Sequence, residues 1–232
     1  MGDTIIKLEN VWKIYRMGKV EVNALRGIDL VIKKGDFVSV MGPSGSGKST
    51  AVNMIGCLDI PTKGRIILEH HDISHLEESE LAQIRGKKIG FIFQQFNLIN
   101  TLSALENVML PMIFQGKSRE DRIKRAEELL TLVGLGERMT HRPTELSGGQ
   151  QQRVAIARAL SNDPEVILAD EPTGNLDSKT GQAIFELLRE LNQKGKTVIV
   201  VTHDNNLASN ADRIIKVADG RIRVSDTNPT SV

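Results

Sequence analysis

Two groups of residues in this sequence have the types and spacing needed to bind a triphosphate. Residues 42–49 read Gly-Pro-Ser-Gly-Ser-Gly-Lys-Ser and fit the pattern G-x-x-x-x-G-K-[ST]. Glycines let backbone N–H groups turn inward around an anion, Lys48 can reach the β- and γ-phosphates, and the Ser49 hydroxyl can bind Mg²⁺. Far downstream, Ser147 followed by two glycines predicts a capped helix start, which is a second anion site.

Hydrolysis also needs groups that act on water and on the transferred phosphate. Asp170 and Glu171 follow the apolar run 166–169, and His203 follows the apolar run 197–201 almost directly. Ligands of doubly wound sheets lie at such strand ends. There an aspartate can position Mg²⁺, a glutamate can take a proton from water, and a histidine can contact the γ-phosphate.

Three other histidines lie in the segment 70–75. His70, His71 and His75 do not have metal-ligand spacing on one face. We interpret this segment as a solvated turn.

The elements that must position these groups follow from hydrophobic patterning. The sequence predicts a strand over 37–41, a helix over 51–58, and buried parallel strands over 166–169 and 197–201. A helix with its apolar face at Ile184, Leu187, Leu188 and Leu191 separates the last two, which indicates an α/β core. Alternation over 5–35 predicts an antiparallel sheet with one wet face.

The region between Gln95 and Leu160 is predicted to be almost wholly helical. Ser118 with Asp121 resembles a capping box, the stripe Ile123, Ala126, Leu130 and Val133 faces a core, and Gly134 is a plausible stop. We therefore expect a core over 1–94 and 161–225, a helical subdomain over 95–160, and a disordered tail over 226–232.

Composition narrows the class of protein. Hydrophobic residues make up 40% of the 232 residues, charged residues 25%, and the net charge is +1. This balance does not favour a nucleic-acid partner. The single cysteine, Cys57, suits a reducing compartment and is expected to be buried on the helix after the phosphate loop. We find no signal-peptide pattern at the N-terminus and no apolar run of about 18 residues that could span a membrane.

Taken together, these motifs resemble the nucleotide-binding subunit of an ABC transporter, over about residues 5–224. The resemblance rests on the phosphate loop, on Leu146-Ser147-Gly148-Gly149-Gln150, on Asp170-Glu171, on Gly174-Asn175-Leu176-Asp177 and on His203. It implies a P-loop NTPase core with a mixed sheet, an N-terminal antiparallel β-subdomain and an inserted α-helical subdomain.

The resemblance also assigns roles to single residues. It implies catalytic roles for Glu171, His203, Gln94 and Lys48, and Mg²⁺ contacts from Ser49, Gln94 and Asp170, with Gln95 an alternative to Gln94. It implies ATP contacts from Tyr15, Gly42, Ser44, Gly45, Gly47, Lys48, Ser49, Thr50, Ser147, Gly149 and Gln150. Tyr15 would stack on adenine.

The same resemblance implies partners and a location. Two copies would sandwich two ATP molecules head to tail, with residues 174–177 crossing to the second copy. An integral membrane permease would bind near Gln94, Phe96 and Leu98, beside the helical subdomain, where Met109, Met112 and Phe114 either line the surface or belong to the core. The chain would then lie in the cytoplasm, peripheral to the membrane. Segments such as Gly56-Cys57-Leu58-Asp59 are similar to the lipoprotein-release and macrolide-export branch, so we expect an exporter.

Two other classes of protein share some of these features. A soluble ABC-type ATPase acting on DNA or ribosomes usually adds coiled coils, a zinc module or a second cassette. A GTPase should carry Asn-Lys-x-Asp, and neither it nor a small-molecule kinase has a use for the motif at 146–150. The sequence shows no long coiled coil, zinc module or second cassette, and no Asn-Lys-x-Asp run.

Overall fold

The computed structural model describes residues 3–18 and 20–226, which form two compact units. The first unit holds the described residues up to Arg85 and those from Ile199 onward, and the second holds residues 86–198. Most of the expected disordered tail therefore lies outside the described residues, although Asp226 itself ends a strand.

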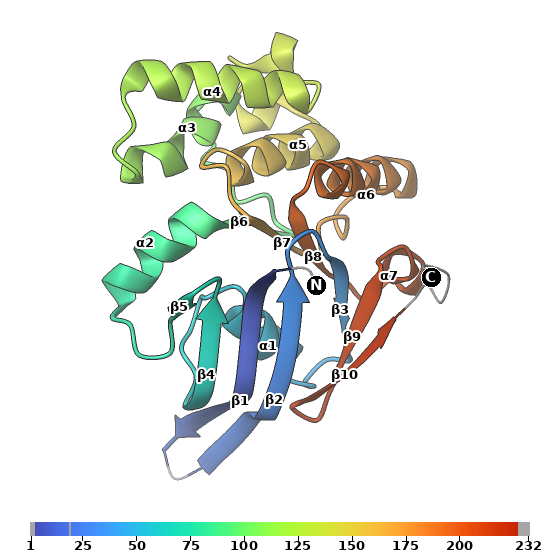
Figure 1. Ribbon diagram of the computed structural model, residues 1–232. Coiled ribbons are helices and arrows are strands. Elements are labelled where there is room, and N and C mark those ends of the chain that lie inside the picture. The colour runs from blue at the N-terminus through green and yellow to red at the C-terminus, as the bar shows by residue number, and fades with distance from the viewer. Residues whose placement is uncertain (1–2, 19, 227–232) are drawn as a thin grey trace. The chain divides into compact units, whose positions relative to one another are not determined.

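A four-stranded sheet in the order β2-β1-β4-β5 forms one layer of the first unit (Figure 1). Its strands are β1 (Thr4–Met17), β2 (Val20–Lys33), β4 (Lys63–Leu68) and β5 (His71–Asp72). All of its pairings are antiparallel, with Leu8 opposite Leu30 and with several β-bulges between β1 and β2. Side chains of β2 from Ile28 onward alternate between buried and exposed, which confirms the one-sided sheet expected from the sequence.

A second set of strands in this unit carries the phosphate loop. The strand β3 (Phe37–Met41) pairs in parallel with β9 (Arg213–Ala218), which pairs with β10 (Arg221–Asp226) in an antiparallel hairpin. Asp219 and Gly220 connect the hairpin, and both have the positive φ that a two-residue turn of type I′ requires. Two helices complete the unit, α1 (Lys48–Ile55) and α7 (Asn205–Ser209).

The helix α1 differs from its sequence prediction at both ends. It begins at Lys48 and ends at Ile55, because Gly56 caps it and Cys57 takes a left-handed backbone with φ of 53°. Cys57 is fully buried, as expected, but it lies in the turn after the helix.

The second unit combines a short parallel sheet with helices. The strands β6 (Ile89–Ile92) and β7 (Val166–Asp170) pair in parallel, and the apolar residues of β7 are all buried. The helix α6 (Ser178–Gln193) buries its predicted apolar face, including Ile184 and Leu188. Two elements straddle the boundary between the units, α2 (Glu78–Lys88) and β8 (Thr197–Val201), and β8 is buried throughout.

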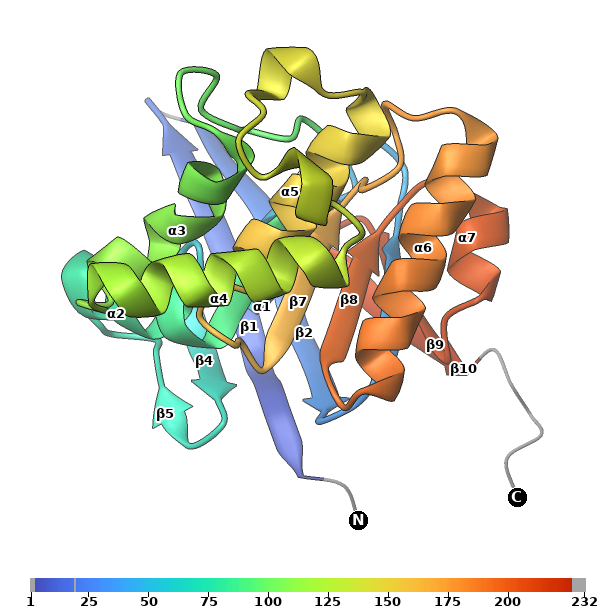
Figure 2. The same ribbon diagram turned by 90° about the horizontal axis from the view of Figure 1, so that it is seen from above.

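Three helices of the second unit pack against one another, α3 (Ala104–Phe114), α4 (Arg119–Leu132) and α5 (Gly148–Ala159) (Figure 1, Figure 2). Short 3₁₀ turns, η1 (Gly136–Arg138) and η2 (Pro143–Glu145), connect α4 to α5. The hydroxyl of Ser118 accepts a hydrogen bond from the Asp121 amide, as predicted, but it donates to the Asp121 carboxylate, so only half of the expected capping box forms. The helix α4 ends just before Gly134, whose φ is 75°.

Candidate functional site

The phosphate loop joins the end of β3 to the start of α1. Gly45 and Gly47 have φ of 78° and 92°, a region that side chains with a Cβ rarely occupy. Gly47 is the N-cap of α1, and no side chain among the described residues caps this helix. The positive end of α1 and its first amides therefore face a loop shaped for an anion.

Close backbone contacts hold this loop in place. A Cβ on Gly47 would lie 2.4 Å from the carbonyl oxygen of Ala24, and one on Gly42 would lie 2.5 Å from that of Val217. The amide of Gly220 also donates to the Ser46 carbonyl at 2.9 Å. The strand β2 and the β9–β10 turn thus fix the loop before any ligand arrives.

A cavity of about 800 Å³ opens over the loop, wholly within the first unit. It brings together every nucleotide residue that the sequence predicts in this unit, together with the predicted histidine. These are Tyr15, Gly42, Ser44, Gly45, Gly47, Lys48, Ser49, Thr50 and His203.

Seven further residues line the same cavity and were not predicted. They are Val22, Asn23, Ala24, Arg26, Pro43, Asp219 and Gly220. Pro43 lies inside the phosphate-loop motif, and the pair Asp219-Gly220 carries a turn signal. The residues of β2 have no local signal, because their place depends on long-range strand pairing.

Two side chains at the cavity come from outside the phosphate loop. Tyr15 lies on β1 opposite Val22, and 37% of its surface is exposed. His203 is exposed and follows β8, where the amide of Thr202 donates to the carbonyl of Val40 at 3.1 Å. This bond ties the residue before the histidine to β3, the strand that leads into the phosphate loop.

The acidic pair lies at the carboxyl end of β7, in the second unit. Asp170 ends the strand and is exposed, and Glu171 follows in a left-handed conformation with φ of 47°. The amide of Gly174 donates to the Glu171 carbonyl at 3.0 Å and closes a tight turn. A non-glycine residue in this conformation is strained, and such strain persists where the surroundings fix it.

Gln94 lies against the turn that follows Glu171. A Cβ on Gly174 would come within 2.6 Å of the Gln94 side-chain nitrogen, and the Asn175 amide donates to the Gln94 carbonyl at 2.9 Å. The structure therefore places Gln94 beside residues 174–175, and both Gln94 and Gln95 are exposed.

A buried glutamine connects the helix α5 to both of these segments. The side-chain amide of Gln152 donates to the carbonyl of Pro172 at 2.7 Å and to that of Phe93 at 3.4 Å. Each carbonyl belongs to the residue next to a predicted catalytic residue. The side-chain oxygen of Gln152 is buried without a partner among the described residues.

The motif at 146–150 forms the start of α5. Ser147 and Gln150 make a complete capping box, in which each side chain bonds the other residue's amide, at 2.9 and 3.3 Å. A Cβ on Gly149 would lie 2.4 Å from the Thr180 methyl group on α6. Gly149 is thus required for helix packing, and it also leaves the amides at the helix start accessible.

Residues 174–177 lead into α6, where Asp177 is the N-cap. Its carboxylate accepts from the Thr180 amide at 3.0 Å. Hydrogen bonding to Thr180 lowers the pKa of the Asp177 carboxyl, so the residue is charged at neutral pH.

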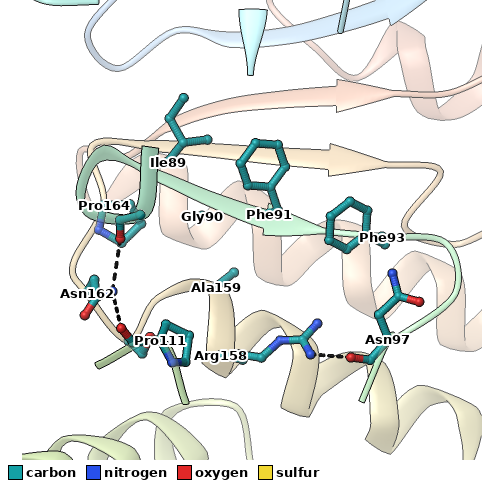
Figure 3. A pocket seen from close by; sticks show the side chains of 12 residues that line it. Ile89, Gly90, Phe91, Phe93, Asn97, Pro111, Arg158, Ala159, Asn162 and Pro164 are labelled. Atoms are coloured by element: carbon teal, nitrogen blue, oxygen red, sulfur yellow. Dashed lines mark hydrogen bonds between the residues drawn. The ribbon is translucent and has the colours of Figure 1, made fainter. Parts of the chain in front are cut away.

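A second cavity, of about 400 Å³, lies within the second unit between β6, α3 and the end of α5 (Figure 3). Phe91 and Phe93 stack with ring centroids 5.8 Å apart along it. The Arg158 guanidinium donates to the Asn97 and Phe96 carbonyls at 2.5 and 2.9 Å, which fixes the chain after Gln94. Three residues of α3 were considered for the permease surface. Met112 is buried, Met109 lines a different cavity, and Phe114 is 86% exposed.

Within the described ranges, no helix has the length and apolar character to cross a membrane. The same residues contain no group of three or more His, Cys, Asp or Glu side chains that could hold a metal ion by themselves.

Comparison with known proteins gives a consistent result. The ABC transporter family matches residues 25–174, which is well over half of the chain. An ABC transporter ATP-binding protein of Thermotoga maritima is 56% identical over 94% of this chain and 93% of its own length. The macrolide export ATP-binding/permease protein MacB of Brucella melitensis is 51% identical, but this chain spans only 36% of it.

Solved structures agree with the sequence comparison. The dimeric cassette MJ0796, from Methanocaldococcus jannaschii, has a TM-score of 0.87 at 56% identity over 97% of this chain and 99% of its own. The same cassette in a post-hydrolysis state bound to ADP and phosphate also has a TM-score of 0.87, at 54% identity and the same coverage. The chain belongs to the ABC transporter family, as an ATP-binding cassette that hydrolyses ATP.

Proposed function

We propose that this cassette is the motor of an exporter, in which two copies close head to tail around two ATP molecules and drive an integral membrane permease. The observation that carries the proposal is the cavity over the phosphate loop, which gathers all the predicted nucleotide contacts of the first unit. The dimeric MJ0796 structures and the MacB relatives support the dimer and the export role.

In the proposed site, the first unit binds the nucleotide. Tyr15 stacks on adenine, while the loop amides and Lys48 hold the phosphates. His203 orients the γ-phosphate from the end of β8. Catalysis of this kind depends on positioning and on stabilising charge, with little covalent chemistry for the protein to do.

We assign activation of the water to the second unit. Glu171 takes a proton from the attacking water, and Gln94 orients the water. The tight turn closed by Gly174 and the bond from Gln152 to the Pro172 carbonyl hold the backbone at Glu171 and at the residue after it. This backbone support fits a residue whose carboxylate must keep one direction.

Magnesium fits the residues that we assign to it. Ser49 offers a hydroxyl within the cavity, Gln94 an amide oxygen, and Asp170 an exposed carboxylate at a strand end. Mg²⁺ prefers oxygen ligands and is commonly bound by one or two carboxylates together with substrate phosphates. When bound, the ion neutralises negative charge on the phosphates.

The second anion site at the start of α5 supports the composite arrangement. In each proposed site the phosphate loop comes from one copy, and Ser147, Gly149 and Gln150 come from the other. Residues 174–177 cross to the second copy. ATP then holds the copies together, and its hydrolysis releases them.

We place the permease contact on the segment 94–98 and the neighbouring helix α3. The cavity in Figure 3 supports this choice, because its stacked phenylalanines offer an apolar recess beside Asn97. The cassette would thereby be held at the cytoplasmic face of the membrane.

The substitution Glu171→Gln tests the proposed base. It keeps the shape of the side chain but cannot take a proton, so we expect a loss of about 100- to 10,000-fold in turnover with ATP binding retained. Steady-state phosphate release and the ATP dissociation constant are the measurements. Glu165→Gln, at the opposite end of β7, is the matched control and should hydrolyse ATP at the normal rate. Near-normal hydrolysis by Glu171→Gln would assign the base elsewhere.

A further inference from the structure

The ring of Tyr15 is held by two other side chains in the first unit. The ammonium group of Lys13 lies 5.4 Å from the centre of the Tyr15 ring. The Tyr15 hydroxyl is 3.4 Å from one oxygen of the Asp59 carboxylate, to which it donates, and Lys13 donates to the other oxygen at 2.7 Å. Residues two apart on a strand share a face, which is why Lys13 and Tyr15 meet.

Asp59 is itself fixed by its surroundings. Its carboxylate accepts from the Ile60 amide at 2.8 Å, and Lys13 donates to the Ile60 carbonyl at 2.9 Å. Thr62 is also bonded to the strand β1. Its amide donates to the Trp12 carbonyl at 2.8 Å, and its hydroxyl accepts from the Ile14 amide at 3.0 Å. The segment 59–62 is therefore fastened along the strand that carries the tyrosine.

This ion pair is well sheltered from water. Only 13% of the Lys13 side chain and 29% of the Asp59 side chain are exposed. Screening by solvent is weaker for such a pair than for one on the open surface. The pair can therefore hold a geometry, whereas an exposed pair would exchange between several.

The arrangement has two consequences for a bound base. A cation over one face of an aromatic ring is attracted to its π-electrons and occupies that face. One face of Tyr15 is thus taken, and a base must use the other. The segment that holds the ring also follows α1, the helix that begins at Lys48, so the ring and the phosphate site are linked through a short stretch of chain.

We propose that Lys13 and Asp59 are positioning residues that hold the Tyr15 ring ready for stacking against the nucleobase. The proposal rests on the role of Tyr15 in the proposed function. A ring that is already ordered does not have to be immobilised by ATP, so binding is tighter. Neither residue needs to touch the nucleotide itself.

The test compares ATP with inorganic triphosphate, which has phosphates but no base. We expect Lys13→Met and Asp59→Asn to weaken ATP binding by about 2- to 10-fold and to leave triphosphate binding unchanged. Lys13→Arg keeps a cation and should restore most of the affinity. Lys7→Met, the same change elsewhere on β1, is the matched control, and thermal unfolding shows whether each variant is folded.

A double-mutant cycle shows whether Lys13 acts through Tyr15. Tyr15→Ala alone should weaken ATP binding roughly 5- to 150-fold. Adding Lys13→Met to it should cause no further loss, because the ring that Lys13 positions is gone. Tyr15 is the only tyrosine, so fluorotyrosine labelling gives one ¹⁹F signal, which Lys13→Met should shift before any nucleotide is added.

Three results would overturn the proposal. Unchanged ATP affinity in folded Lys13→Met, with Tyr15→Ala impaired, would remove the positioning role and leave stacking intact. If Lys13→Met weakened triphosphate binding as much as ATP binding, the effect would lie at the phosphates and not at the base. Normal ATP affinity in Tyr15→Ala would exclude stacking itself, and with it both assignments.

Discussion

Burial changes the chemistry of the one cysteine. Cys57 is fully buried after α1, and desolvation raises the pKa of its thiol from 9.0 to about 12. Because the folded pKa is the higher one, the neutral thiol contributes stability below pH 9, and this contribution declines as the pH rises toward 12. At pH 8 the native thiolate is about a thousandfold scarcer than in an unperturbed cysteine.

We therefore expect Cys57 to resist Ellman's reagent in the native protein at pH 8 and to react fully in denaturant. No other cysteine contributes to the signal. A Cys57→Ala variant provides the blank. Rapid reaction of the native protein would mean that the turn after α1 opens readily.

At the scale of elements, one buried side chain organises the loop before α3. The amide of Asn107 donates to the carbonyls of Ile99, Leu102 and Ser103, at 2.9 to 3.2 Å, and its oxygen accepts from the Ile99 amide at 2.8 Å. The side chain is completely buried. These bonds supplement the backbone hydrogen bond from the Leu102 amide to the Ile99 carbonyl, at 3.1 Å.

Asn107→Ala should lower the free energy of unfolding by about 2–4 kcal/mol, because it removes all of these hydrogen bonds, including those that Asn107 makes with the Ile99 amide and the Leu102 carbonyl. Urea unfolding followed by circular dichroism measures the loss. Gln182→Ala, an exposed helical position, should change stability by less than about 0.5 kcal/mol. A loss at Asn107 as small as the control's would show that water replaces these hydrogen bonds.

Element types were predictable where one local pattern decided them. The apolar runs at 37–41 and 197–201 became buried strands, and Gly134 ended α4, since these features depend on neighbouring residues. The helix α1 begins three residues before its predicted start, because Lys48, Ser49 and Thr50 at the end of the phosphate loop form its first turn. The Asp121 carboxylate accepts a hydrogen bond from the Ser118 hydroxyl and not from the Ser118 backbone amide. Side-chain rotamers of this kind cannot be predicted from a local sequence pattern.

In the candidate site too, residues within local motifs could be predicted from the sequence, whereas contacts between distant segments could not. The phosphate loop and His203 could be located from motifs. The contacts of Ala24 and Gly220 with that loop could not, because they join β2 and the β9–β10 turn to residues far away in the chain. Lys13 gave no signal as a partner of Tyr15, since lysines on strands are usually solvated.

At the scale of the whole molecule, the proposed composite site predicts complementation. Lys48→Ala and Ser147→Arg should each abolish hydrolysis alone. When equal amounts are mixed, random pairing makes half the dimers mixed, and each mixed dimer has one intact site, so about a quarter of the wild-type activity should return. ATPase activity of the mixture checks this. No recovery despite demonstrated mixed dimers would contradict the head-to-tail arrangement.

The proposed docking to a permease predicts a second effect at this scale. Phe114 is 86% exposed at the end of α3, so Phe114→Asp should not disturb folding. An unpaired carboxylate buried at an interface costs about 3–5 kcal/mol, so the variant should leave the membrane fraction when a permease is co-expressed. Phe96→Asp is a poorer choice, because the Phe96 ring lies beside Gly148 and its loss would also disturb α5.

Leu132→Asp, at the end of α4, is the control for Phe114→Asp. Both variants should bind ATP normally when they are purified alone. Retention of Phe114→Asp in the membrane fraction at the wild-type level would move the contact away from α3.

The division of the chain has a consequence for its biosynthesis. The first unit is interrupted by the whole of the second, so residues 86–198 leave the ribosome before β9 and β10 exist. Until then β3 lacks its partner β9 and presents an unpaired edge, which is prone to aggregation. The turn at Asp219 and Gly220, which lines the phosphate cavity, is synthesised after the whole of residues 86–198. A nascent chain therefore gains its ATP site only after the whole of the second unit has been synthesised.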